Sequence, residues 1–114
     1  MGDRLIERIT EVQEARKALV RELTALGEAM EFNRAARQAG STVSELFSAG
    51  PGPAARKRAR DAWSRLNGAL HAYRTEAIRI LVDDEGRSLA SAARLTGNAR
   101  QVVSRLYHGA DTPH

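Results

Sequence analysis

The side chains best suited to chemistry lie between residues 99 and 108, where polar and apolar positions alternate with helical spacing. Val103 and Leu106 are three residues apart, so both would face a core and leave the polar side chains outside. Arginine can make two hydrogen bonds to a guanine edge, and glutamine can make two to an adenine edge. The residues expected to contact bases are Arg100, Gln101, Ser104 and Arg105.

Two short helices joined by a glycine turn would position this face. The first is expected from Leu89 to Leu95, with Ser88 as its N-cap. The second is expected from Ala99 to about Tyr107. Gly97 lies just past the first helix, where the chain needs a positive φ that glycine adopts freely. Ala93 is small, as required where two helices cross closely.

The segment therefore combines Ala-x-x-x-Gly with a following Val-x-x-Leu, after apolar residues and an acidic glycine turn. With these elements, residues 74–109 resemble the three-helix helix-turn-helix of bacterial regulators and of resolvase-type DNA-binding domains. The resemblance implies double-stranded DNA as partner and a role in transcription regulation. The matched residues are Ile78, Leu81, Ser88, Leu89, Ala92, Ala93, Gly97, Val103 and Leu106.

The sequence departs from that pattern directly after the turn glycine. Asn98 and Ala99 stand where the pattern has an apolar residue and a capping serine or threonine. If Asn98 is the N-cap, the second helix starts one residue early and presents a rotated face.

Two other functions fit the same pattern. The chain could be a helical protein–protein interaction module without nucleic acid, in which the corner at Gly97 only packs. Alternatively, the helix-turn-helix could bind another protein. Exposure of the outer face at residues 100–105 separates a reading face from a packed corner.

A long helix is expected from about Arg4 to Ala39, capped by Asp3. Its apolar side chains recur at heptad steps, which predicts a coiled coil, and Arg16 fills the one missing position. Because a single helix cannot bury this stripe alone, we expect a homodimer, and the width of the stripe also fits packing of this helix within its own chain. The expected dimerisation residues are Leu5, Ile9, Val12, Leu19, Leu23, Leu26 and Met30.

The rest of the chain is also expected to be helical, which makes the fold all-α. Thr42 and Glu45 form a capping box that opens a short helix. The Gly-Pro-Gly-Pro run breaks the chain, and a second long helix follows it to near Val82. The expected division is an assembly region over 1–49, a hinge over 50–53, a helical region ending in the helix-turn-helix over 54–109, and a tail over 110–114.

The chain has a net charge of +4, which permits nucleic-acid binding without requiring it. A basic run lies in the first turns of the second long helix, where the helix dipole disfavours cations. This placement suggests that the run binds an external anion. The alternative is that these side chains form a solvated helix end. The expected phosphate contacts are Arg56, Lys57, Arg58, Arg60, Arg87 and Arg94.

The remaining side chains suggest no enzyme. The chain has no cysteine, and His71, His108 and His114 lack metal-ligand spacing, so neither a metal site nor a cofactor is expected. The absence of cysteine fits a reducing cytoplasm. The apolar runs are too short for a membrane span or a secretory signal.

Overall fold

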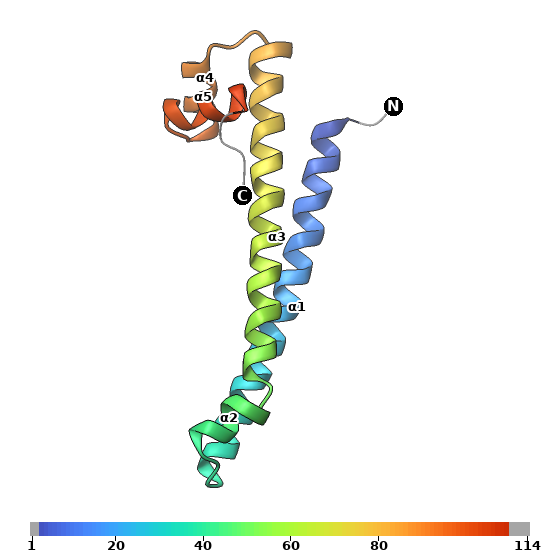
Figure 1. The fold of residues 1–114 in the computed structure, drawn as a ribbon. Coiled ribbons are helices and arrows are strands. Elements are labelled where there is room, and N and C mark those ends of the chain that lie inside the picture. Colours follow the sequence, from blue (N-terminus) through green and yellow to red (C-terminus); the bar gives the residue numbers. More distant parts are fainter. Residues whose placement is uncertain (1–2, 110–114) are drawn as a thin grey trace. The chain divides into compact units, whose positions relative to one another are not determined.

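The computed structural model describes residues 3–109, and all regular elements in this part are helical (Figure 1). The all-α fold expected from the sequence is confirmed, including the long N-terminal helix. The expected tail, residues 110–114, lies outside the described residues. The elements are α1 (Arg4–Gln38), α2 (Val43–Ala49), α3 (Gly52–Arg79), the π-helical turn η1 (Ile80–Asp84), α4 (Leu89–Thr96) and α5 (Arg100–His108).

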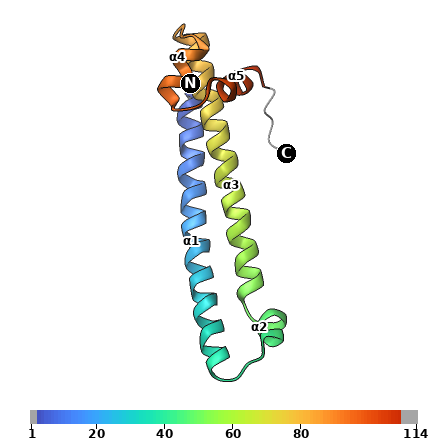
Figure 2. The ribbon, with the colours of Figure 1, turned by 90° about the vertical axis from the view of Figure 1, so that its left-hand side faces the viewer.

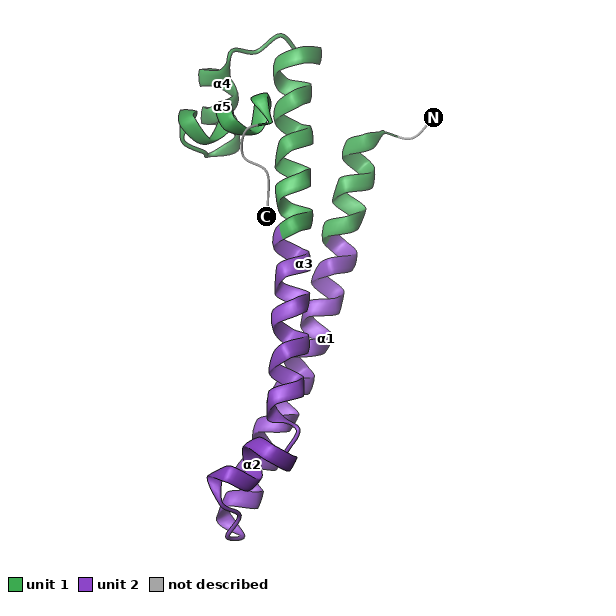
Figure 3. Cartoon of the chain, in the orientation of Figure 1, with its two compact units in different colours: residues 1–12, 68–114 green, residues 13–67 purple. Residues whose placement is uncertain are grey.

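The described chain divides into two compact units (Figure 3). The first contains residues 3–12 and 68–109, and the second contains residues 13–67. The Gly-Pro run at 50–53 links α2 to α3 inside the second unit, so the border between the units does not fall there. The hinge expected at this run stays a prediction.

The second unit is a helical hairpin in which α1 and α3 run side by side (Figure 2). Its buried seam consists almost entirely of alanine, and the largest side chain in it is a leucine. Small side chains allow two helices to approach closely, since the distance between helix axes depends on the residues at the contact. The buried seam is Ala15, Leu19 and Ala29 from α1 with Ala55, Ala59 and Ala62 from α3.

A capping box begins α2, and two glycines connect α2 to α3. Thr42 accepts a hydrogen bond from the Glu45 backbone N–H at 3.1 Å, and Glu45 accepts one from the Thr42 N–H at 3.0 Å. These hydrogen bonds lower the pKa of the Glu45 carboxyl. A Cβ at Gly50 would collide with the Leu46 carbonyl oxygen, and one at Gly52 would lie 3.0 Å from Asn33 Nδ2. Only glycine therefore fits at position 50, whereas a larger residue at position 52 would require Asn33 and Met30 to shift.

The first unit has its own core around α4 and α5. Ile78 from α3 and Val103 from α5 are the largest fully buried side chains. Ala92, Ala93 and Leu106 complete the buried cluster, and Leu81, Leu89 and Val102 are among the partly buried side chains against it. The helices α3, α4 and α5 and the turn η1 thus share one small core.

The end of α3 differs from the sequence prediction, which placed it near Val82. The helix continues through η1 to Asp84, with the Glu85 N–H donating to the Ile80 carbonyl at 2.9 Å. Two of the three carboxylates in this acidic turn have partners. Asp83 accepts a hydrogen bond from Tyr107 at 2.7 Å, and Asp84 lies 3.7 Å from Arg79.

Candidate nucleic-acid interface

The turn between α4 and α5 has the geometry that the sequence indicates. Ser88 caps α4 by accepting a hydrogen bond from the Ser91 N–H at 3.1 Å. Gly97 has φ 69° and ψ 24°, in the left-handed region, and its N–H donates to the Ala93 carbonyl. The Asn98 N–H donates to the same carbonyl at 3.1 Å. Two hydrogen bonds thus fix the exit of α4 directly above the buried Ala93.

The helix α5 starts at Arg100, with Ala99 as N-cap in an extended conformation. Ala99 has no side chain to cap the helix, and Asn98 does not replace it. The Asn98 Nδ2 instead donates to the Thr96 carbonyl at 3.3 Å. The earlier start that an Asn98 cap would cause does not occur, so the face of α5 is not rotated.

The side chains of α5 divide into a buried face and an exposed one. Val103 is fully buried and Leu106 is 4% exposed. Arg100, Gln101 and Arg105 are exposed, while Ser104 is half-buried. The four side chains expected to contact bases thus lie away from the core. Arg100, Gln101 and Arg105 are exposed to solvent in the described chain.

The segment that contains α4 and α5 is positively charged, and the acidic residues of the unit that lie nearest in sequence are Asp83, Asp84 and Glu85 of the preceding turn. Between residues 86 and 109 the sequence contains four arginines and no acidic residue. Arg87 and Arg94 are exposed, and the Arg87 Nη1 donates to Ser91 Oγ at 3.1 Å. Within residues 3–109 none of the four arginines forms an ion pair.

A hydrogen bond anchors the last turn of α5 to η1. Tyr107 donates its hydroxyl proton to Asp83 Oδ1, and this carboxylate raises the pKa of the tyrosine hydroxyl. The ring of His108 lies edge-on to that of Tyr107, with ring centroids 5.1 Å apart. The hydrogen bond between Tyr107 and Asp83 was not predicted from the sequence, because these two residues are 24 positions apart.

A second contact that the sequence analysis missed lies in the last turns of α3. The Glu76 side chain is 9% exposed and accepts hydrogen bonds from Arg79 Nη2 at 2.9 Å and Nε at 3.3 Å. The hydrogen bond from Arg79 lowers the pKa of the Glu76 carboxyl against the opposing effect of burial. The three-residue spacing on one helix was the available signal.

The remaining expected phosphate contacts belong to the second unit. Arg56, Lys57, Arg58 and Arg60 are all exposed near the start of α3. Lys57 pairs with Asp61 at 3.1 Å, and Arg58 pairs with Glu22 at 3.1 Å. These two cations are therefore partly compensated within the chain.

The expected dimerisation residues fall into two groups on α1. Leu5, Val12, Leu19 and Leu26 recur every seven residues and are buried or half-buried, and Ala15 and Ala29, each three residues past a member of this series, are buried beside them. Ile9, Leu23 and Met30 are 39%, 50% and 47% exposed. The expected seam thus includes two adjacent stripes, and the described chain covers only one.

The part of the chain that the structure describes offers no metal centre, because no group of three or more of its side chains could hold an ion. None of the helices in residues 3–109 combines the length and the apolar character needed to cross a membrane. Comparisons with models of protein families, with curated proteins and with solved structures found no match.

Proposed function

We propose that this chain is a sequence-specific DNA-binding protein that regulates transcription. The observation that carries the proposal is the division of α5, in which Val103 and Leu106 are buried while Arg100, Gln101 and Arg105 are exposed. A reading helix needs this arrangement, because its core face fixes the helix while its outer face enters the major groove.

In this proposal, each side chain of the interface has one of two roles. Arg100, Gln101, Ser104 and Arg105 contact base edges and determine sequence preference. Arg87 and Arg94 contact phosphates, which positions the helix without reading sequence. The lack of acidic residues between 86 and 109 supports both roles, because no carboxylate there repels the DNA backbone.

We also propose that the protein binds DNA as a homodimer. The support is the exposed stripe on α1, where Ile9, Val20 and Leu23 are each at least 39% exposed. Large apolar side chains repeated along one exposed helix are typical of an interface. A symmetric dimer would bind an operator of two related half-sites.

The test is selection of bound fragments from random double-stranded DNA, followed by anisotropy titration of the selected sequence and a scrambled one at the same salt concentration. We expect the parent to prefer the selected sequence by a factor that Arg105→Ala reduces. Arg34→Ala is the matched control, because Arg34 is exposed on α1 and pairs with Glu31. Failure of the parent to bind any DNA at low salt would favour the interaction module instead.

A further inference from the structure

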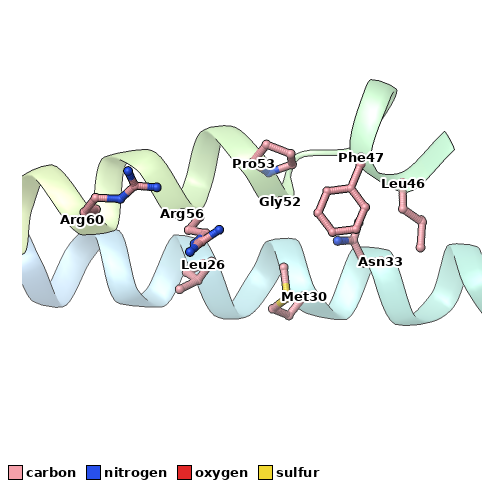
Figure 4. A pocket seen from close by; sticks show the side chains of 9 residues that line it. All are labelled: Leu26, Met30, Asn33, Leu46, Phe47, Gly52, Pro53, Arg56 and Arg60. Atoms are coloured by element: carbon pink, nitrogen blue, oxygen red, sulfur yellow. The ribbon is translucent and has the colours of Figure 1, made fainter. Parts of the chain in front are cut away.

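A groove in the second unit lies between α1, α2 and the first turns of α3 (Figure 4). Its volume is about 590 Å³, within the range of roughly 300–1,000 Å³ typical of small-molecule sites. Leu26, Met30 and Phe47 supply apolar walls, while Arg56 and Arg60 extend from α3. The groove therefore combines an apolar part with a cationic one.

The two arginines in the groove differ from their neighbours in the same basic run. Lys57 and Arg58, which do not line this groove, pair with Asp61 and Glu22. Arg56 and Arg60 do line it, and neither has an acidic partner within residues 3–109. Within one run of basic residues, the unpaired cations are thus those that face the groove.

The local backbone adds to this uncompensated charge. Arg56 and Arg60 are four residues apart on one helix, where like charges repel. Arg56 also lies in the second turn of α3, which begins at Gly52 and carries the positive end of the helix dipole, whereas Arg60 lies one turn farther on. The mutual repulsion makes this pair of cations unfavourable in isolation, and a bound anion would offset it.

The apolar side chains of the groove are exposed to solvent. Phe47 is 72% exposed and Met30 is 47% exposed, and both line the same groove, so they form an exposed apolar patch. Asn33 also lines the groove, and its Oδ1 is buried with no hydrogen-bond partner in the described residues. An apolar ligand in the groove would contact Met30 and Phe47.

We propose that this groove binds a small organic anion with an apolar body. The carboxylate or sulfonate of such a ligand accepts hydrogen bonds from the Arg56 and Arg60 guanidinium groups. The body of the ligand covers Met30 and Phe47. The site belongs to the second unit and does not depend on the proposed reading of DNA by α5.

The experiment uses two dyes that share an apolar body and differ in charge, anilinonaphthalene sulfonate and neutral phenylnaphthylamine. Fluorescence titration of the full chain should show one sulfonate site per chain, with higher affinity than for the neutral dye. Arg56→Gln with Arg60→Gln should lower sulfonate affinity by about tenfold or more, because this variant removes hydrogen bonds to a charged group. The same variant should leave the affinity for the neutral dye unchanged.

Two further variants separate the contributions of charge and apolar contact. Lys57→Gln with Arg58→Gln removes the same charge from the same run and should keep the parent's affinity. Phe47→Ala should weaken both dyes together. Arg56→Lys with Arg60→Lys preserves both charges and should retain most of the sulfonate affinity, which guards against a folding defect in the glutamine variant.

Three results would overturn the proposal. If the parent bound both dyes with equal affinity, the groove would not be an anion site. The same conclusion would follow if Arg56→Gln with Arg60→Gln and Lys57→Gln with Arg58→Gln lost sulfonate affinity equally. Light scattering provides the third. A change in mass on adding dye, or in Phe47→Ala, would mean that a second copy of the chain occupies the groove instead of a small molecule.

Discussion

Tyr107 in α5 donates a hydrogen bond of 2.7 Å to Asp83 in η1, across 24 residues of sequence. This bond joins the last turn of the proposed reading helix to the turn at the end of α3. It also gives a hydrogen-bond partner to Asp83, the first of three consecutive acidic residues at positions 83–85. The α5 helix is thus held by packing at Val103 and Leu106 and by a polar contact near its C-terminus.

The Tyr107 contact predicts a pH dependence. Asp83 raises the folded pKa of the tyrosine hydroxyl, so the stabilisation is complete below the unfolded pKa of about 10 and disappears as pH rises through the folded value. Absorbance titration in a Tyr73→Phe background reports on Tyr107, since the chain has two tyrosines. Asp83→Asn should lower the midpoint. An unchanged midpoint would show that the bond does not form in solution.

The crossing of α4 and α5 predicts sensitivity to size at Ala93. This residue is 6% exposed within the buried cluster, so Ala93→Leu should overpack the crossing and lower the free energy of unfolding by about 1–3 kcal/mol. Urea denaturation measures the change. Ala35→Leu is the control, because Ala35 is exposed on α1 and the same enlargement there should have little effect. Equal stability of both variants would contradict this packing.

The turn at Gly97 predicts a different kind of cost. A Cβ at this position would meet no atom within 4 Å, so the penalty for substitution comes from the positive φ alone. Gly97→Val should therefore destabilise the unit more than Gly97→Asn, because asparagine tolerates the left-handed region and β-branched residues do not. Urea midpoints of the two variants check the order, and a larger effect for asparagine would contradict it.

Local signals in the sequence were sufficient to predict most of the helices. Capping at Asp3, Thr42 and Ser88, and the positive φ at Gly97, depend on residues within a few positions of each other. The buried positions of α5 also followed from helical spacing, since Val103 and Leu106 needed only one partner face.

Apart from the local Glu76–Arg79 pair, most features that the sequence did not predict depend on partners outside their own helical turn. The heptad pattern of α1 could not show which apolar stripe packs on α3. The pattern describes α1 alone and does not show which of its faces the alanines of α3 contact. Leu19 became core while Leu23, four residues on, remained half exposed. The end of α3 was misplaced for the same reason, since the acids of η1 are stabilised by Tyr107 and Arg79.

A leucine-to-glutamate substitution should affect folding in one stripe of α1 and dimer formation in the other. Leu19 is 7% exposed, so Leu19→Glu would bury a carboxylate and should destabilise the hairpin by about 4 kcal/mol or more. Leu23 is 50% exposed, so Leu23→Glu should leave the helical circular dichroism intact and shift the mass to that of a monomer. Light scattering measures the mass. A folded Leu23→Glu dimer would exclude this stripe as the interface.

The proposed reading face predicts that the arginines of α5 determine sequence discrimination, whereas Arg87 and Arg94 contribute only affinity for DNA. Arg100 and Arg105 are exposed on α5, so Arg105→Ala or Arg100→Ala should cost about 1–3 kcal/mol of discrimination between selected and scrambled DNA. Arg87→Ala with Arg94→Ala should weaken binding to both DNAs alike. Removing each phosphate-binding arginine should reduce the slope of log affinity against log salt by about 0.9.

Titrations of these variants against both DNAs at several salt concentrations separate the two roles. The start of α5 at Arg100 makes the assignment specific, because no rotated face remains to explain a failure. If the Arg100 and Arg105 variants keep the parent's discrimination, α5 does not read bases. If the Arg87 and Arg94 variant loses discrimination without a change in salt slope, these side chains contact bases and the roles of the two pairs are exchanged.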